Sequence, residues 1–265
     1  MDAQRINRNA IAEAYQAIGR HIRRTPTMEI SPSELGLSFR NPIILKLELF
    51  QHAGSFKARG AFANLVLREV PDVGVTAASG GNHGAAVAFA ARQLGHKATI
   101  FVPEIASPAK LAQIRDAGAE LVIAGQRYAD ALEKCERFAA TTGAMAIHAY
   151  DQPETLLGQG TLGLELEVQS PRLGTILVAT GGGGLVGGIA AWVQDRASII
   201  AVEPRTSASL HAALAAGSPV DVEVSGIAAD SLGARRVGKL MFPIAQAFVE
   251  KVALVEDDAI RSAQE

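Results

Sequence analysis

Short apolar runs alternate with longer amphipathic stretches along most of this chain. In residues 4–21 the apolar side chains recur about every 3.6 positions, which predicts a helix. Residues 43–49 alternate instead, with isoleucine and leucine on one face and Lys46 and Glu48 on the other, which predicts a strand. A second helix is expected over residues 57–68.

Further apolar runs with helical stretches between them indicate the fold class. Helices are expected at residues 85–94 and 185–193, and a last strand at 251–255 is followed by Asp257 or Asp258 as a candidate helix cap. Strands that alternate with helices predict βαβ units and a mostly parallel sheet, so the fold class is α/β. The other expected strands are residues 73–78, 98–102, 120–124, 145–148, 175–179 and 199–202.

Composition narrows the choice of partner. The chain has 265 residues, of which 48% are hydrophobic and 20% charged, as in ordinary globular proteins. The formal charge of −2 offers no general attraction to nucleic acid or to an anionic membrane, so a small molecule is the expected partner. The single cysteine, Cys135, cannot form an intrachain disulfide, and this suits a reducing cytoplasm. The N-terminus lacks the apolar stretch of a signal peptide, and no apolar run is long enough to span a bilayer.

Residues 54–60 read Gly-Ser-Phe-Lys-Ala-Arg-Gly and place Lys57 at the expected start of a helix. A lysine that reacts with an aldehyde must be uncharged, so surroundings that lower its pKa favour that chemistry. The positive potential of a helix N-terminus acts in this direction, and Ser55 is the expected cap of that helix. Taken alone, a lysine of this kind is more often an ordinary surface residue of a helix, and only the segments that follow favour a chemical role for Lys57.

Four glycines, Gly181 to Gly184, stand between the strand expected at residues 175–179 and the helix that follows it. Glycines after a strand let several backbone N–H groups converge, and a helix N-terminus behind them favours a phosphate. Residues 182–187 also satisfy the dinucleotide fingerprint, with Glu203 at a fitting distance. A nicotinamide site is therefore a rival reading, although it leaves Lys57 without a role.

Residues 79–84 read Ser-Gly-Gly-Asn-His-Gly and again lie between a strand and a helix. The backbone amides of this loop, with Ser79 and Asn82, can receive a carboxylate, and the Asn82 amide can bond a phenolic oxygen. His83 is either an acid or base, or a side chain that holds the shape of the loop. An inert strand-to-helix turn is the alternative for the whole segment.

The three segments in this order resemble the serine/threonine dehydratase branch of the fold-type II pyridoxal-phosphate enzymes, which are similar in fold to the tryptophan synthase β-subunit. Residues 158–161 and 201–204 extend the resemblance. It implies two open, mostly parallel α/β domains with pyridoxal 5′-phosphate between them. A smaller domain of residues 74–149 would be inserted into a larger, cofactor-binding domain formed by residues 1–73 and 150–265, which looks incomplete at its C-terminus.

The resemblance also implies the residues of the site. Lys57 would be the catalytic residue and would hold the cofactor covalently, and Asn82 would bond the 3′-oxygen of the cofactor. The other cofactor contacts would be Phe56, Gly181, Gly182, Gly183, Gly184 and Leu185. The substrate contacts would be Ser79, Gly81, Asn82 and His83.

This chain departs from the family pattern in three places. Racemases of this branch have a serine at the position of Gly80, and its absence makes a two-base racemase the lesser alternative. Relatives bind a divalent cation at the positions of Glu203, Ser207 and Ser209. A serine in place of a carboxylate weakens such a site, so no metal is expected, with Glu203 as a weak candidate, and magnesium should matter little. Relatives also continue beyond residue 265, into elements that bring a serine or cysteine to the pyridine nitrogen.

We therefore expect the protein to be a threonine or serine ammonia-lyase (dehydratase) of amino-acid metabolism. It would catalyse a pyridoxal-phosphate-dependent β-elimination that yields a 2-oxo acid and ammonia, as a cytoplasmic homodimer. The alternative from another class is a truncated, non-catalytic homologue that binds only the cofactor or a partner. Substrate preference among serine, threonine and hydroxyaspartate stays open, because one methyl group is worth only about 1–3 kcal/mol in an apolar pocket.

Overall fold

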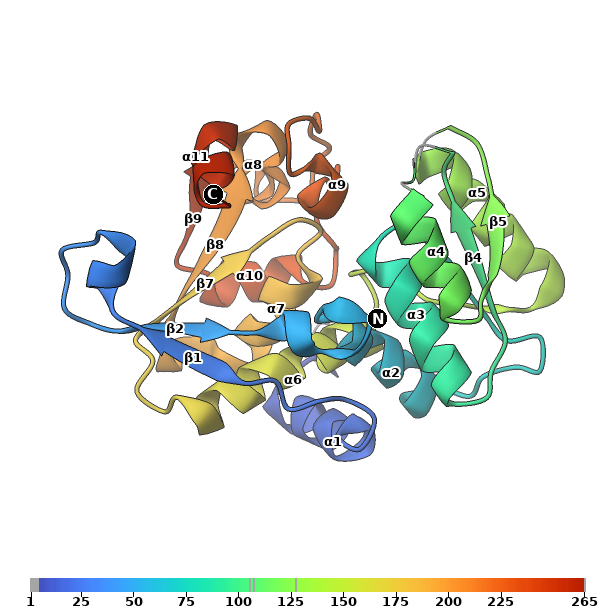
Figure 1. The fold of residues 1–265 in the computed structure, drawn as a ribbon, viewed down its shortest axis with the longest axis horizontal. Helices are drawn as coiled ribbons and strands as arrows, with labels where there is room; N and C mark the ends of the chain where they lie inside the picture. Colours follow the sequence, from blue (N-terminus) through green and yellow to red (C-terminus); the bar gives the residue numbers. More distant parts are fainter. Residues whose placement is uncertain (1–4, 105, 107, 127, 265) are drawn as a thin grey trace.

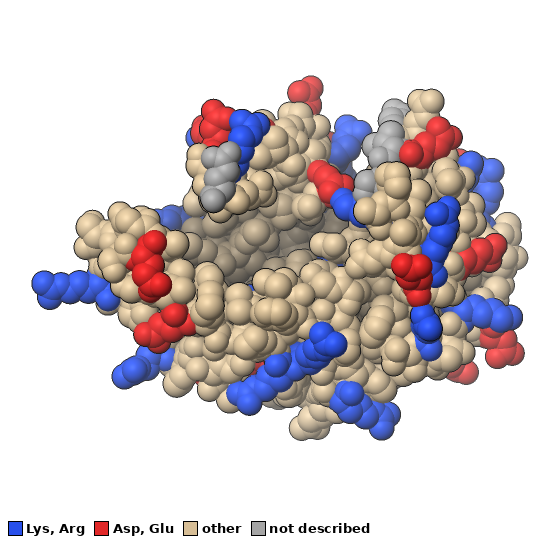
Figure 2. Space-filling view, viewed as in Figure 1, with Lys and Arg blue, Asp and Glu red and all other residues tan. Residues whose placement is uncertain are grey.

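The computed structural model describes residues 5–104, 106, 108–126 and 128–264, which form two lobes, each built around its own parallel sheet (Figure 1). The middle of the chain forms one lobe, and the N- and C-terminal parts form the other. Figure 2 shows a hollow in the middle of this face, with charged side chains mostly around the outside of the molecule. In the described part of the chain, no helix has the length and apolar character needed to cross a membrane. The α/β class predicted from the sequence is confirmed.

The smaller lobe contains a four-stranded sheet in the order β5-β4-β3-β6, with every pairing parallel. All residues of β3 and β4 are buried, because helices cover both faces of a parallel sheet. The elements are β3 (Val75–Ala78), α3 (Asn82–Gln93), β4 (Ala98–Val102), α4 (Pro108–Asp116), β5 (Glu120–Ile123), α5 (Tyr128–Thr142) and β6 (Met145–Ala146).

The larger lobe contains a three-stranded parallel sheet in the order β7-β8-β9. Its core packs Ile199 and Ala201 of β8 against apolar side chains of the flanking helices. The elements are α6 (Pro153–Gln169), β7 (Thr175–Ala179), α7 (Gly184–Val193), η5 (Gln194–Arg196), β8 (Ser198–Pro204), η6 (Arg205–Ser207), α8 (Ser209–Ala216), α9 (Ala229–Leu232), α10 (Phe242–Phe248), β9 (Lys251–Val255) and α11 (Asp257–Ser262).

Helix α6 brings α2 (Lys57–Leu67) close to α7, and glycines make both approaches possible. A Cβ at Gly158 would lie 2.4 Å from the carbonyl oxygen of Arg59 in α2. A Cβ at Gly188 of α7 would lie 2.6 Å from the backbone nitrogen of Gly160 in α6. The helix that carries Lys57 and the helix that follows the four glycines therefore share one neighbour.

The N-terminal part differs from the predicted pattern. Helix α1 (Arg8–Ile18) is shorter than predicted, and an antiparallel hairpin of β1 (Thr27–Ile30) and β2 (Ile43–Lys46) follows it. The sequence missed β1, and it extended β2 to residue 49. The pairing ends where Leu47 donates to Pro26, because a proline has no N–H to continue the ladder. The short helices here are η2 (Pro32–Leu35), η3 (Glu48–Phe50) and η4 (His52–Gly54).

The boundaries of other elements also differ from those predicted from the sequence. Helix α3 starts at Asn82 instead of residue 85, and β6 spans two residues instead of four. Asp257 and Asp258 lie in the first turn of α11, whose N-cap is Glu256, so the predicted aspartate cap is wrong. The domain boundaries at residues 74 and 149 stay a prediction, and the four-stranded sheet falls between them.

Candidate active site

Lys57 is the first residue of α2, and its amine is buried. Its Nζ donates to the carbonyl oxygen of Ala149 at 2.7 Å and lies 5.2 Å from the centre of the Phe56 ring. Within the described residues, no carboxylate forms an ion pair with it. Burial therefore lowers the pKa of Lys57 to about 8, as expected for an ammonium group removed from water without a counter-ion.

Ser55 does not cap this helix, contrary to the sequence-based prediction. Its backbone is extended, and Phe56 occupies the N-cap position, with no side-chain hydrogen bond at the cap among the residues described. The helix begins one residue too late for the Ser55 hydroxyl to reach the first free N–H groups. In the described structure, the Ser55 hydroxyl is buried without a hydrogen-bond partner.

The four glycines form the turn between β7 and α7. No backbone hydrogen bond among the described residues uses the N–H of Gly181, Gly182 or Gly183 as its donor. Gly183 has φ of +87°, and a Cβ there would lie 2.4 Å from the terminal methyl of Met241. Three free N–H groups at the N-terminus of a helix can receive an anion.

A segment that the sequence did not single out, residues 147–151, joins the parts of this site. The carbonyl of Ala149 accepts from Lys57, and a Cβ at Gly182 would lie 2.3 Å from the ring of Tyr150. The amine and the glycine turn therefore both lie against one dipeptide, Ala149–Tyr150. Residues 147–151 follow β6, at the carboxyl end of a parallel strand, and ligands bind at that edge of parallel sheets. This position in the chain could have identified the segment as part of the site.

The loop after β3 carries the predicted substrate contacts. The hydroxyl of Ser79 accepts from the N–H of Gly81 at 3.2 Å, which fixes the turn. Asn82 is exposed and opens α3, so its side chain is accessible. Among the described residues, the N–H groups of Asn82 and His83, at the start of α3, donate to no backbone carbonyl. The loop thus presents a second helix N-terminus with free donors.

The imidazole of His83 is buried, and its Nε2 lies 3.0 Å from the carbonyl oxygen of Ile147. Burial, and then the charge of Lys57, lower the pKa of His83 to about 3. The ring is therefore neutral and donates from Nε2. The sequence left open whether His83 acts as an acid or base or holds the shape of the loop. This geometry favours the second role, in which His83 holds residues 79–84 against residues 147–151.

Glu203 is fully buried at the end of β8 and caps α8. Its two carboxylate oxygens accept the N–H groups of Leu210 and His211, each at 2.8 Å, and burial raises its pKa. Among the described residues, no cluster of three histidine, cysteine, aspartate or glutamate side chains could hold a metal. Glu203 is thus already occupied by backbone donors, and the response to magnesium stays a prediction.

Comparison with known proteins agrees with this geometry. The pyridoxal-phosphate-dependent enzyme family matches residues 18–265. The L-threonine ammonia-lyase of Geobacter sulfurreducens is 37% identical over 257 residues, which cover 94% of this chain and 63% of that protein. The chain thus spans less than two thirds of that relative.

Solved structures give the same assignment. Maize serine racemase superposes with a TM-score of 0.91 at 32% identity, covering 97% of this chain and 79% of that chain. The threonine deaminase of T.th. superposes with a TM-score of 0.90 at 34% identity, covering 97% of this chain and 84% of that chain. The chain belongs to the family of pyridoxal-phosphate-dependent enzymes, and pyridoxal 5′-phosphate is its cofactor.

Proposed function

We propose that this protein is an ammonia-lyase that converts L-threonine or L-serine to a 2-oxo acid and ammonia by β-elimination. The observation that carries the proposal is the placement of the desolvated Lys57 amine beside the dipeptide that packs on the glycine turn. The threonine ammonia-lyase and threonine deaminase among the relatives support the same reaction.

The residues present fit the cofactor. The Lys57 amine has a pKa near 8, three backbone N–H groups are free at the glycine turn, and the buried Ser55 hydroxyl lacks a partner among the described residues. Lys57 would hold the aldehyde carbon, and the amides from Gly181 to Leu185 would hold the phosphate. Phe56 would pack on the cofactor, and Asn82 would bond its 3′-oxygen.

The same residues account for the reaction. Pyridoxal 5′-phosphate, when bound, supplies an electron-accepting ring conjugated to the substrate nitrogen. The substrate carboxylate would bind beside Gly81, at the free amides of Asn82 and His83 and at the Ser79 hydroxyl, which accepts from the N–H of Gly81 and can donate its own proton. Neutral Lys57 accepts the α-proton. The β-hydroxyl leaves with a proton as water, and the released enamine becomes an imine, which water converts to the 2-oxo acid and ammonia.

Elimination is preferred to racemisation because of Gly80. A racemase needs a second proton-transferring group on the face opposite the lysine. A Cβ at Gly80 would lie 2.8 Å from the Cβ of Ala106, so a serine side chain would require that neighbour to move. Elimination needs no group at this position.

Substitution of Lys57 tests the proposal. Lys57→Ala should lose the visible absorbance of covalently held cofactor, and release of 2-oxo acid from threonine and serine should fall below detection. Borohydride reduction of the wild-type protein, followed by peptide mapping, should place the cofactor on Lys57. Lys97→Ala, at an exposed lysine of the smaller lobe, should change neither result.

Other outcomes separate the alternatives. Turnover retained by Lys57→Ala would refute the assignment. A yellow wild-type protein that releases no 2-oxo acid would favour the non-catalytic homologue, and racemised serine would favour the racemase. Because the chain spans only part of its first curated relative, turnover is the decisive measurement.

The proposal extends to a homodimer in the reducing cytoplasm, where the lone Cys135 needs no oxidised partner. Exposed apolar side chains gather on and after the β1–β2 hairpin, as is typical of protein interfaces. They include Leu35, Leu37, Phe39, Leu49 and Phe50. Sedimentation of the wild-type protein as a monomer at micromolar concentration would contradict the dimer.

A further inference from the structure

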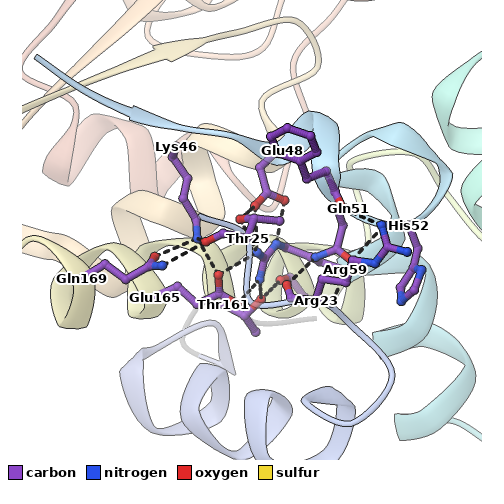
Figure 3. A network of polar contacts seen from close by, with 12 residues as sticks. Arg23, Thr25, Lys46, Glu48, Gln51, His52, Arg59, Thr161, Glu165 and Gln169 are labelled. Carbon is purple, nitrogen blue, oxygen red and sulfur yellow. Dashed lines mark hydrogen bonds and ion pairs between the residues drawn. The ribbon is translucent and has the colours of Figure 1, made fainter. Parts of the chain in front are cut away.

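A buried ion cluster lies two residues along α2 from Lys57 (Figure 3). Arg59 is 0% exposed and bonds both oxygens of Glu48 at 2.8 Å. It also bonds both oxygens of Glu165 in α6, at 2.8 and 2.9 Å. Lys46 donates to Glu165 at 2.6 Å and to Gln169 at 2.8 Å. Two cations and two carboxylates balance, so the cluster avoids the cost of an unpaired buried charge.

The cluster closes the loop that carries Lys57. Glu48 stands before this loop and Arg59 stands just after the lysine, so their two-bond ion pair ties residues 48–59 into a ring. Gln51 fixes the middle of the ring, because its side chain accepts from the N–H of Arg23 at 2.9 Å and donates to the carbonyl of Arg23 at 2.7 Å. Glu165 then fastens the ring to α6.

The sequence of the loop does not hold this shape by itself. Ala53 and Gly54 have φ of 56° and 73°, a left-handed conformation that alanine adopts at a cost. The helix that follows has no side-chain cap among the described residues, and Ser55 in particular does not provide one. Contacts from outside the loop must therefore fix the first turn of α2.

We propose that Arg59, Glu48 and Glu165 are positioning residues for Lys57. They hold the first turn of α2 against α6 and keep the amine at the carbonyl of Ala149. A guanidinium group is planar and can grip two carboxylates at once through paired hydrogen bonds, whereas an ammonium group is a point charge with three donors. Arg59→Lys therefore preserves the charge balance of the cluster but removes the paired hydrogen bonds that join Glu48 to Glu165.

The test measures the position of the lysine rather than the stability of the fold. The readout is the visible circular dichroism of the holoenzyme per mole of bound cofactor, which reports how rigidly the chromophore is oriented. Arg59→Lys should lose more than about half of this signal, and kcat should fall about tenfold to a hundredfold while KM changes much less, since misplaced reacting groups lower the rate of the chemical step. Wild-type dichroism in a folded, cofactor-loaded Arg59→Lys protein would overturn the proposal.

A matched control separates positioning from general loss of stability. Leu210 lies in α8, is 0% exposed and packs in the apolar core of the larger lobe. Leu210→Ala should lower the unfolding temperature because it leaves a cavity, yet retain the dichroism per bound cofactor. If both variants lose the signal in proportion to their loss of stability, the cluster has only a structural role.

Glu48→Gln decides the question if Arg59→Lys does not fold. Its side chain is 13% exposed, so this end of the cluster tolerates a change most readily, and glutamine keeps the size while weakening the paired bonds to Arg59. Unchanged dichroism in Glu48→Gln overturns the proposal, and a partial loss supports it. The inference rests on the cofactor role of Lys57 but not on elimination. A wild-type protein that binds cofactor without turnover would therefore refute the proposed reaction and leave this test valid.

Discussion

Lys57 illustrates how burial changes the pKa of a single side chain. Among the described residues its amine has a carbonyl acceptor and no carboxylate, so burial is not offset by an ion pair. Burial therefore lowers the lysine pKa from 10.5 to about 8. Arg59, two residues further on, has the opposite situation, because two carboxylates stabilise its charge. One turn of helix thus holds a cation that can lose its proton and a cation that cannot.

This difference predicts the pH dependence of cofactor capture. Only the neutral amine reacts with an aldehyde, so the rate at which the apoprotein takes up pyridoxal 5′-phosphate should rise through a midpoint near pH 8 and then level off. Stopped-flow absorbance measures this rate. A rate that still rises steeply at pH 10, as for an ordinary lysine, would show that the amine is not desolvated as described.

At the scale of elements, the contact between α2 and α6 places the site. Glycines on both helices bring the two backbones together, and Gly158 approaches Arg59 and Gly60 most closely. Helix α6 contacts α7 through a second glycine pair, Gly160 and Gly188. The glycines of α6 therefore set the separation between the lysine helix and the helix of the glycine turn.

Gly158→Ala should consequently disturb the site as well as the fold. The added methyl would lie 2.4 Å from the carbonyl oxygen of Arg59, which forces α2 away from α6. The free energy of unfolding should fall by about 1–3 kcal/mol or more, as for other overpacked contacts, and cofactor affinity should fall with it. Urea unfolding and cofactor titration measure both quantities. Gly174→Ala is the control, since a Cβ there meets nothing within 4 Å and should have little effect.

At the scale of the whole molecule, the N-terminal helices α1 and α2 share an apolar core with β3, α3 and β4 of the smaller lobe. An exposed ion pair also joins the two lobes. Lys110 of α4 pairs with Asp230 of α9, so a charge of the smaller lobe meets a charge of the larger one. Their side chains are 31% and 68% exposed, and exposed pairs contribute little because water and salt screen them. This pair therefore adjusts how the lobes approach each other and does not hold the molecule together.

Lys110→Ala should change KM for the proposed substrates by less than about fivefold, the equivalent of about 1 kcal/mol. Raising the salt concentration from about 0.05 to about 0.5 M should change KM of the wild type in the same direction and have less effect in the variant. Arg137→Ala breaks an exposed pair within α5 and should leave KM unchanged. A salt effect on KM as large in Lys110→Ala as in the wild type would show that the Lys110–Asp230 pair is not its source.

Local sequence patterns correctly predicted those strands and helices whose residue types favour the structure that they adopt in the fold. Residues 98–102, 175–179 and 251–255 are strands with the predicted bounds, because short runs of apolar and β-branched residues favour strands. Lys57 was correctly placed at the first turn of α2. The prediction of a Ser55 cap failed, because Phe56 occupies the N-cap position of α2 and Arg59 anchors its first turn instead.

The sequence by itself determined the α/β class, the order of the lysine and glycine-rich segments, and the family, because these depend on periodicity and on residue types along the chain. Only the tertiary structure decided that residues 147–151 join the amine to the glycine turn, that His83 is committed to Ile147, and that backbone donors occupy Glu203. These contacts join residues far apart in the chain, and burial, rather than residue type, sets their protonation. No local pattern encodes either property.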